Sequence, residues 1–565
     1  MKNIRIIIFF FALLVAAFLA LVVRCVYLQL QKNDYYVDIC TKQQQAQVIK
    51  KPQRGAILDS RGRVLAASNK IQTIFAEPRV IKDAKSTSNK LAPILNMPAH
   101  EICKIITESK NPGFAKIRPD AATKECDTAV KIYGIGVQSD WRRHYPTGSL
   151  AAHVIGFTSI DNRGLEGIEL RYDKELAGSV GQNIFLADAF RRPIRLKQQN
   201  NILSDGAGII LTLDAAIQQF ARAELKQQYE SYEAEAAVAI VAEPKTGAIL
   251  AMVSLPDFDP NDFRSANTDS FRNRAITDQF EPGSILKPIV AAVAVDTGIV
   301  GRDEKIFCEN GNYHGKGFGQ IGEYGNHRFA DLTVSEILVH SSNIGMAKIG
   351  QKLGKDKLYN GLKLFGFGDK TGIDLPGEAE GYLSPPQKWT GYSVTRIPFG
   401  QEISITAIQL VRAFCILANG GRQVSPYLVR AMVDNKGQLI KQKQPSPPVG
   451  FVVKPEVANW IVTDALAGVV NEGTGKKARL EKWQVFGKTG TAQLAKRNER
   501  GYSDRDYIAS FIAGAPAEDP KAIVLVSICK PNIGLGKGYT GGTIAAPVAA
   551  KILEKTLNYL EKHQH

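Results

Sequence analysis

Residues 280–298, FEPGSILKPIVAAVAVDTG, decide the fold of the chain around them. Pro282 and Gly283 break the backbone just before Ser284, and the residues that follow are apolar on nearly every side. A helix with this pattern is a buried helix, so the sequence predicts a loop that delivers Ser284 to the start of a core helix. Lys287 lies one helical turn further on, and we expect its amine on the same face as the Ser284 hydroxyl.

A serine and a lysine at the mouth of a buried helix suit an activated nucleophile. An un-ionised lysine can take the serine proton, and the N-terminus of a helix favours developing negative charge. The spacing alone is not specific, since Ser527 and Lys530 repeat it within the apolar run AIVLVSICKP. That run is typical of a strand, in which residues three apart face opposite sides, so the second pair cannot cooperate. Taken alone, the first pair is equally compatible with a structural role.

The composition is that of a folded, basic protein. The chain has 565 residues, of which 44% are hydrophobic and 22% charged, which is ordinary for globular proteins and allows several domains. The formal net charge of +16 indicates that the protein works beside an anionic surface or polymer. Because the sequence has no zinc-ligand spacing and no RNA-binding signature, we expect a membrane surface or an acidic polymer and no nucleic acid.

The N-terminus contains a candidate membrane anchor. Residues 6–23 form an unbroken apolar run, about as long as a bilayer core is thick, and Lys2 and Arg5 precede it. A cleaved signal peptide is the alternative, but no small-x-small cleavage site follows the run. We predict a retained single-pass helix in the plasma (inner) membrane, with residues 1–5 in the cytoplasm, 6–24 in the membrane and the bulk outside the cytoplasm.

The cysteines carry little information about function. They are scattered, odd in number and without a Cys-x-x-Cys or Cys/His cluster, so we expect no metal site. One disulfide in the N-terminal half is possible, but the sequence does not assign it. The seven positions are Cys25, Cys40, Cys103, Cys126, Cys308, Cys415 and Cys529.

The order of the remaining elements predicts an α+β fold. Residues 54–68 indicate a strand, a turn at Arg61-Gly62 and a second strand, and the polar stretch 197–208 is typical of a domain boundary. Beyond it, a short strand, a helix capped by Asp214 and two apolar strands precede the Ser284 helix. Apolar strands and a long helix close the chain, which is typical of an antiparallel sheet backed by helices. His153 lies among apolar residues, and we interpret it as structural.

Two further triplets support a chemical site. Ser341-Ser342-Asn343 and Lys488-Thr489-Gly490 follow the Ser284 helix, and Lys488 ends an apolar β run, as expected at a sheet edge beside a cleft. Context selects against the other copies of these patterns, since Lys245 fits a hairpin turn and Lys370 a loop. Those other copies are Ser109-Lys110-Asn111, Ser265-Ala266-Asn267, Lys245-Thr246-Gly247 and Lys370-Thr371-Gly372.

The ordered set of motifs, Ser-x-x-Lys, Ser-x-Asn and Lys-Thr-Gly, resembles that of the penicillin-recognising serine transferases and β-lactamases. RGAILDSRGRVLA, RHYPTGSLAAHVIGFT and GLEGIELRYDKELAG resemble the N-terminal module of class B penicillin-binding proteins. LTLD, FGQEISITAIQL, GTGKKA and GGTIAAPV resemble their transpeptidase domain. The matches cover most of the chain in the expected order, and HVIGFTSIDNRGLEGIE resembles the cell-division type more than the elongation type.

The resemblance implies three structural parts. An N-terminal membrane helix would lead into an elongated mixed α/β pedestal module of the dimerisation type, at residues 25–204. A penicillin-binding transpeptidase domain would follow at residues 205–565. That domain would hold an antiparallel five-stranded sheet flanked by helices and an all-helical subdomain.

The resemblance also implies site residues. The catalytic set would be Ser284, Lys287, Ser341, Asn343 and Lys488, and the substrate-binding set Thr489, Gly490 and Thr491. Ser284 would attack the carbonyl between the last two D-alanines of a peptidoglycan stem peptide, with Lys287 as base, kept un-ionised with the help of Lys488. Ser341 would relay the proton to the leaving D-alanine, and Asn343 would bind Lys287 and the substrate backbone.

The remaining implied contacts concern the substrate and the partners. Lys488, Thr489 and Thr491 would hold the terminal carboxylate, and the N–H groups of Ser284 and Thr491 would form an oxyanion hole. No cofactor or metal is required. The ligands would be D-Ala-D-Ala stem peptides and β-lactams, and the partners a membrane glycosyltransferase and division proteins. Glycosyltransferase activity of this chain itself is not expected.

Four other functions share parts of this pattern. A β-lactamase must activate water, and no Glu-x-x-x-Asn stretch of the class A kind lies between Asn343 and Lys488. A non-catalytic division scaffold would not require lysines at the edge of a core. A carboxypeptidase that uses water as acceptor, and an elongation-type transpeptidase, stay compatible with the sequence.

Overall fold

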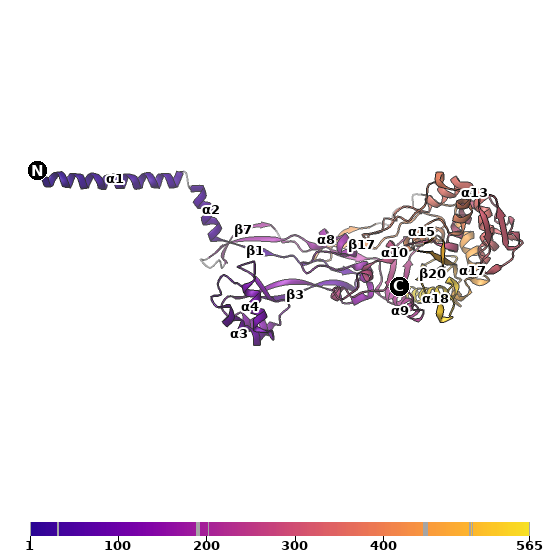
Figure 1. The fold of residues 1–565 in the computed structure, drawn as a ribbon, viewed down its shortest axis with the longest axis horizontal. Coiled ribbons are helices and arrows are strands. Elements are labelled where there is room, and N and C mark those ends of the chain that lie inside the picture. The colour runs from indigo at the N-terminus through magenta and orange to yellow at the C-terminus, as the bar shows by residue number, and fades with distance from the viewer. Residues whose placement is uncertain are drawn as a thin grey trace. The chain divides into compact units, whose positions relative to one another are not determined.

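The computed structural model describes residues 2–30, 33–187, 193–201, 203–443, 450–496, 499 and 501–563 (Figure 1). Contacts divide the chain into two compact units. The first unit is made of residues 1–53 and 178–206, and the second of residues 54–177 and 207–565.

The first unit begins with the long apolar helix that the sequence predicts. Helix α1, Lys2–Leu30, has no buried residue and is long and apolar enough to cross a membrane; no other helix of the described residues is. A second helix and a three-stranded antiparallel sheet in the order β1-β6-β7 follow: α2 (Asn33–Gln44), β1 (Gln45–Lys50), β6 (Gly181–Ala187) and β7 (Pro193–Asn201). The polar residues 197–201 therefore form a strand, where the sequence suggested only a boundary segment.

The N-terminal part of the second unit is a sheet covered by small helices. Its strands pair in the order β18-β17-β8-β2-β3-β4, and β5 pairs with β3. The apolar faces of α3, α4 and α5 cover the β3–β4 region with a core that includes Leu91, Ile102 and Ile74. The elements are β2 (Ile57–Leu58), β3 (Val64–Ala76), α3 (Ala84–Leu95), α4 (Ala99–Thr107), β4 (Ala115–Arg118), α5 (Thr123–Ala129), β5 (Ile135–His144), β8 (Gly208–Leu211), β17 (Val429–Val433) and β18 (Leu439–Gln442).

The predicted strand, turn and strand at residues 54–68 is confirmed. β2 and β3 are joined by a tight turn in which Gly62 has a φ of 79°, a conformation that glycine adopts without a Cβ clash. Arg61 Nε at this turn donates to Asp214 Oδ2 at 2.8 Å. Asp214 also caps α9 (Ala215–Ser231) by accepting from the Ala216 N–H, as the sequence predicts.

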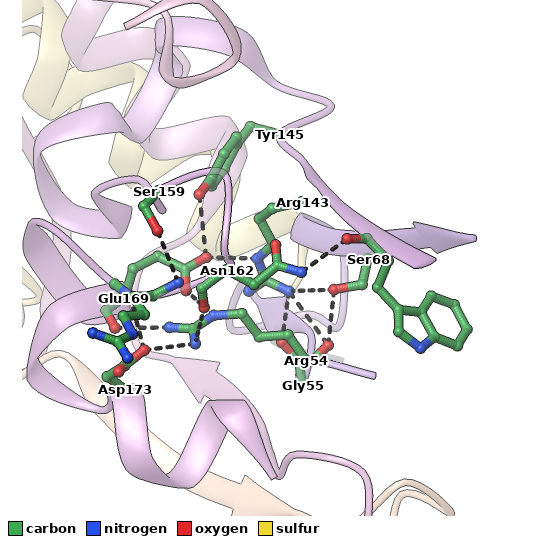
Figure 2. A network of polar contacts seen from close by, with 12 residues as sticks. Arg54, Gly55, Ser68, Arg143, Tyr145, Ser159, Asn162, Glu169 and Asp173 are labelled. Atoms are coloured by element: carbon green, nitrogen blue, oxygen red, sulfur yellow. Dashed lines mark hydrogen bonds and ion pairs between the residues drawn. The ribbon is translucent and has the colours of Figure 1, made fainter. Parts of the chain in front are cut away.

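A buried polar network holds the start of this part together (Figure 2). The Glu169 carboxylate is fully buried and accepts from Arg54 Nε and Arg143 Nε, each at 2.6 Å. Arg54 also reaches Asp173 Oδ1 at 2.6 Å, and Arg143 donates to the Gly55 carbonyl at 2.8 Å. Three chain segments that lie far apart in the sequence are thus joined through one carboxylate.

His153 is structural, as predicted. Its ring is buried against Phe258, and Nε2 lies 2.8 Å from the Ser270 carbonyl oxygen. Burial lowers the pKa of His153 to about 4, so the ring is neutral at physiological pH and donates through Nε2.

The five-stranded antiparallel sheet predicted for the catalytic domain is present. Its order is β10-β9-β21-β20-β19, which leaves β19 at one edge. Helices α9 and α18 pack side by side on one face, and the other face packs on the helical part of the domain (Figure 1). The elements are β9 (Ala236–Ala242), β10 (Ile249–Leu255), β19 (Phe486–Ala495), β20 (Tyr502–Ala515), β21 (Ala522–Cys529) and α18 (Gly541–Lys562).

The helical part carries the rest of the core. Residues 287–294 of α11 are all buried, which confirms the predicted core helix. Two small two-stranded antiparallel sheets, β12–β15 and β13–β14, lie between α11 and α12 in the chain. The expectation of an all-helical subdomain is therefore wrong in this segment, where backbone pairing forms short strands. The elements are α11 (Lys287–Asp296), β12 (Lys305–Phe307), β13 (Asn312–Gly315), β14 (Gly319–Gly322), β15 (Asp331–Thr333), α12 (Val334–His340), α13 (Asn343–Leu364), α15 (Ala407–Ala418), α16 (Pro455–Trp460) and α17 (Ala467–Asn471).

The cysteines are reduced wherever their side chains are described. Cys25, Cys103 and Cys126 of the N-terminal half are free thiols, so no disulfide joins these three. The possible disulfide therefore finds no support among them, and the Cys40 side chain lies outside the described residues.

Candidate active site

Ser284 is delivered by a short 3-10 turn, Gly283–Leu286, that precedes α11. Gly283 has a φ of 55°, and its N–H donates to the Gly400 carbonyl at 3.1 Å. The α-helix begins at Lys287, one turn after Ser284, and the Lys287 side chain is fully buried. The predicted order of break, serine, lysine and core helix is confirmed, with a tighter first turn than expected.

Lys287 Nζ is held by the turn between α12 and α13. It donates to the Ser341 carbonyl oxygen at 2.5 Å and to Asn343 Oδ1 at 2.8 Å, and Ser341 Oγ lies at 3.3 Å. Ser341 ends α12 in the left-handed conformation, with a φ of 59°, which turns both its carbonyl and its hydroxyl toward the lysine. In the described part of the chain, no hydrogen bond joins Lys287 directly to Ser284.

Lys488 reaches the same serine from the sheet. Its side chain is fully buried, and Nζ donates to Ser341 Oγ at 2.9 Å. The sequence suggested that Lys488 ends a β run, but it is the third residue of β19. The strand continues because residues 486–493 pair in register with β20. Ser341 Oγ therefore lies between two buried lysine amines.

Burial determines the charge of both lysines. Burial lowers the pKa of Lys287 to about 7, although the nearby Glu323 carboxylate acts in the opposite direction and raises it. Burial, and then the charge of Lys287, hold the pKa of Lys488 well below its usual value. We expected the charge of Lys488 to lower the pKa of Lys287, but it is the charge of Lys287 that lowers the pKa of Lys488. Lys287 is protonated below about pH 7 and neutral above it, so near neutral pH it can accept a proton.

The residues after Lys488 form the wall of the cleft along the edge strand. Thr489 Oγ1 lies 2.7 Å from Thr474 Oγ1, and Thr491 Oγ1 accepts from the Gly541 N–H at 3.1 Å. Gly490 is required by packing, since a Cβ there would lie 2.8 Å from Ile285 and 3.0 Å from the Pro282 carbonyl oxygen. The absence of a side chain at Gly490 lets β19 approach the turn that carries Ser284.

Several of these groups line one open cleft of about 620 Å³. Ser284, Ser341 and Asn343 line it from the helical side, and Thr489 and Thr491 line it from β19. At the mouth, the hydroxyls of Tyr324 and Tyr539 lie 3.4 Å apart, and Tyr539 stacks on Tyr507. The cleft therefore carries the Ser284 hydroxyl and several other hydroxyls on its walls, and the two buried amines reach it through Ser341.

Two protein-family models match the chain and identify its family. Residues 237–554 match the penicillin-binding protein transpeptidase domain, and residues 49–211 match the penicillin-binding protein dimerisation domain. This chain is a class B penicillin-binding protein. The resemblance read from the motifs is confirmed.

Individual relatives support the assignment over nearly the whole chain. Stage V sporulation protein D of Bacillus subtilis is 34% identical over 557 residues, which is 96% of this chain and 84% of the relative. Peptidoglycan D,D-transpeptidase FtsI of Escherichia coli is 30% identical over 88% of this chain and 82% of its own length. The structure of penicillin-binding protein 3 of Mycobacterium tuberculosis complexed with ampicillin superposes with a TM-score of 0.71, at 25% identity over 91% of this chain and 96% of that one.

In the structure of this penicillin-binding protein, five of the eight predicted site residues line one cleft: Ser284, Ser341, Asn343, Thr489 and Thr491. The buried amines of Lys287 and Lys488 contact Ser341, and Gly490 lies between Thr489 and Thr491 in β19.

The other copies of the motifs lie elsewhere. Lys530 pairs with Glu235 at 2.6 Å, and Ser527 bonds to Ser510 within the sheet. Lys245 forms an ion pair with Asp519 in a hairpin turn, and Lys370 is exposed in a loop. Lys245 and Lys370 thus lie in a turn and a loop, as the sequence predicts.

Two residues of the site were missed by the sequence analysis. Glu323, directly after β14, contacts the Ser342 hydroxyl and the Asn343 N–H, and Thr474 contacts Thr489 from the loop that follows α17. Thr474 belongs to the GTGKKA stretch, which carried a resemblance but no assigned role. Glu323 has no local signal, because its contacts join residues 20 positions apart.

Proposed function

We propose that this protein is a peptidoglycan D,D-transpeptidase that works through a serine acyl-enzyme, with Ser284 as nucleophile. The observation that carries the proposal is the convergence of two buried lysine amines on Ser341. One of these lysines, Lys287, lies one helical turn after Ser284. Ser284 Oγ attacks the carbonyl between the last two D-alanines of a stem peptide, and the bond to the terminal D-alanine breaks. An amine of a neighbouring strand then takes the acyl group and forms the crosslink.

Lys287 acts as the base in this scheme. An ammonium has three N–H donors, which match its three contacts with Ser341 and Asn343. The neutral amine keeps two donors, for the two shorter contacts at 2.5 and 2.8 Å, and gains a lone pair that can accept the Ser284 proton. A pKa of about 7 makes that neutral form available at physiological pH.

Ser341 and Lys488 return the proton. Lys488 Nζ donates to Ser341 Oγ, which leaves the Ser341 hydroxyl free to pass a proton between Lys287 and the leaving D-alanine nitrogen. Asn343 holds Lys287 and the substrate backbone, and Lys488, Thr489 and Thr491 hold the terminal carboxylate.

Backbone donors complete the proposed site. The N–H groups of Ser284 and Thr491 form the oxyanion hole, for which each donor typically contributes about 3–4 kcal/mol. Gly490 serves the site by letting β19 approach the Ser284 turn. The scheme assigns no step to a metal or cofactor.

The cellular setting is inferred from the anchor and the relatives. We place the N-terminus in the cytoplasm, since Lys2 and Arg5 precede the apolar run of α1, and the catalytic domain outside it. Residues 25–204 act as a pedestal for the domain at 205–565. The resemblance of HVIGFTSIDNRGLEGIE to the cell-division type supports a septal role, with a membrane glycosyltransferase and division proteins as partners. Distribution of a fluorescent fusion along the side wall, and none at mid-cell, would contradict that role.

The test of the proposed activity uses the full-length protein in detergent. A donor peptide ending in D-Ala-D-Ala and an amine acceptor should yield free D-alanine and an amide-linked product, and prior treatment with benzylpenicillin should stop both. Release of D-alanine with water as the only acceptor would indicate a carboxypeptidase. Rapid turnover of the penicillin would indicate a β-lactamase.

A further inference from the structure

Glu323 is a buried carboxylate that the proposed mechanism does not use. It follows β14, is 8% exposed and lies on the wall of the cleft. Its oxygens accept from the Asn343 N–H at 2.7 Å, from the Ile344 N–H at 3.3 Å and from the Ser342 hydroxyl. One side chain thus accepts hydrogen bonds from the first backbone donors of α13. A negative charge at this N-terminus also interacts favourably with the helix dipole.

The residue before it orients the Asn343 amide. Asn343 Nδ2 donates to the Gly322 carbonyl at 3.1 Å, which turns Oδ1 toward Lys287 Nζ at 2.8 Å. The amide orientation is therefore fixed by the same short segment whose carboxylate holds the Asn343 backbone. Gly322, the last residue of β14, and Glu323, the next residue, therefore hold the side-chain amide and the backbone N–H of Asn343.

Ser341 depends on the same support. Its left-handed backbone costs energy for a residue with a Cβ and persists only when its surroundings hold it. On one side it is the C-cap that follows α12, and on the other it is followed by Ser342, whose hydroxyl donates to Glu323 and accepts from the Gly345 N–H. Loss of the carboxylate would free the turn that presents Ser341 to the two lysines.

Charge gives Glu323 a second effect, on Lys287. The Glu323 carboxylate raises the pKa of Lys287, and burial lowers it. The other charged group that faces Lys287 is Lys488 of β19. Around Glu323, the Cys308 thiol lies against Ser342, and Lys348 and Asp331 act on Cys308 from further out. Glu323 is thus the anionic partner of the lysine pair among the described groups.

We propose that Glu323 is a positioning residue of the acyl-transfer site, which locks the Ser341–Asn343 turn onto Lys287 and supplies the negative charge that this lysine faces. This inference rests on the proposed serine acyl-enzyme. It predicts that the carboxylate sets both the rate of acylation and the pH at which acylation begins.

The test compares Glu323→Gln with wild type in the full-length protein, by the second-order rate of labelling with a fluorescent penicillin between about pH 5 and 9. The wild-type rate should rise through about pH 7 as Lys287 loses its proton. In the variant the plateau should fall at least about tenfold, as is typical when a supporting hydrogen-bond partner is lost. The rise should also move to lower pH by about one unit or more, because loss of the anion favours neutral Lys287.

Two other variants separate positioning from folding. Glu323→Asp keeps the charge but shortens the side chain, so we expect a lower plateau with the rise close to its wild-type pH. Glu336→Gln removes an equivalent helix-capping carboxylate, which bonds the Thr333 N–H at 2.8 Å at the start of α12, and should leave rate and pH profile as in wild type.

Each outcome has a distinct meaning. A Glu323→Gln profile equal to that of wild type would overturn the inference. A lower rate with an unmoved rise, together with a lower melting temperature, would reduce Glu323 to a structural cap and would also overturn it. Failure of the wild-type protein to be labelled at all would instead overturn the proposed function on which the inference rests.

Discussion

Replacement of Lys287 by glutamine should lower the rate of acylation by a penicillin about 10²–10⁴-fold, the usual contribution of a general base. Lys287 is the amine whose pKa lies near 7. Glutamine keeps an N–H donor on a side chain one bond shorter, but its amide nitrogen cannot take a proton. Stopped-flow or gel-based labelling with a fluorescent penicillin measures the rate. The variant should remain folded, since a buried amine that carries a desolvation cost is replaced by a neutral amide.

The second Ser-x-x-Lys pattern provides the matched control. Lys530 belongs to that pattern but pairs with Glu235 at the end of β21, so Lys530→Gln should be labelled at the wild-type rate. Equal rates for Lys287→Gln and wild type would show that another group takes the Ser284 proton.

Replacement of Glu169 by glutamine should destabilise the protein by about 3–5 kcal/mol, the usual cost of breaking a buried ion pair. Glu169 is fully buried and pairs with both Arg54 and Arg143, so the neutral amide leaves two guanidinium groups buried with less compensation. Arg54 keeps Asp173, which is 35% exposed, whereas Arg143 keeps only carbonyl and hydroxyl partners. Urea denaturation followed by fluorescence measures the loss.

An exposed ion pair nearby provides the comparison. Asp120 and Arg142 are 3.1 Å apart and both more than half exposed, so Asp120→Asn should change stability by about 0–1 kcal/mol. Asparagine also suits the left-handed backbone of Asp120, which has a φ of 56°. A loss for Glu169→Gln no larger than that for Asp120→Asn would contradict a central role of the buried network.

Much of the site could be predicted from local sequence. Gly283 and the apolar run after Ser284 specify a turn and a core helix through backbone sterics and hydrophobic periodicity, which act over a few residues. The choice of Lys488 over Lys245 and Lys370 also rested on local context, because a lysine within an apolar strand differs from one in a turn. Asp214 as a helix cap is a further local signal that the structure confirms.

The contacts that were missed depend on tertiary structure. Glu323 is brought to Asn343 by the β13–β14 hairpin, and no periodicity marks its approach. The polar residues 197–201 form a strand because β6 provides a pairing partner, although their composition is typical of a loop. Lys488 lies inside β19 because β20 supplies the register, which the strand's own sequence does not contain.

The most direct test of the account is the site of covalent modification by benzylpenicillin. The full-length protein is treated with the drug, digested with a protease and analysed by tandem mass spectrometry. We expect one long-lived adduct with the mass of the intact drug, on Ser284. An adduct on another residue, or no adduct under conditions where the protein is folded, would contradict Ser284 as the nucleophile.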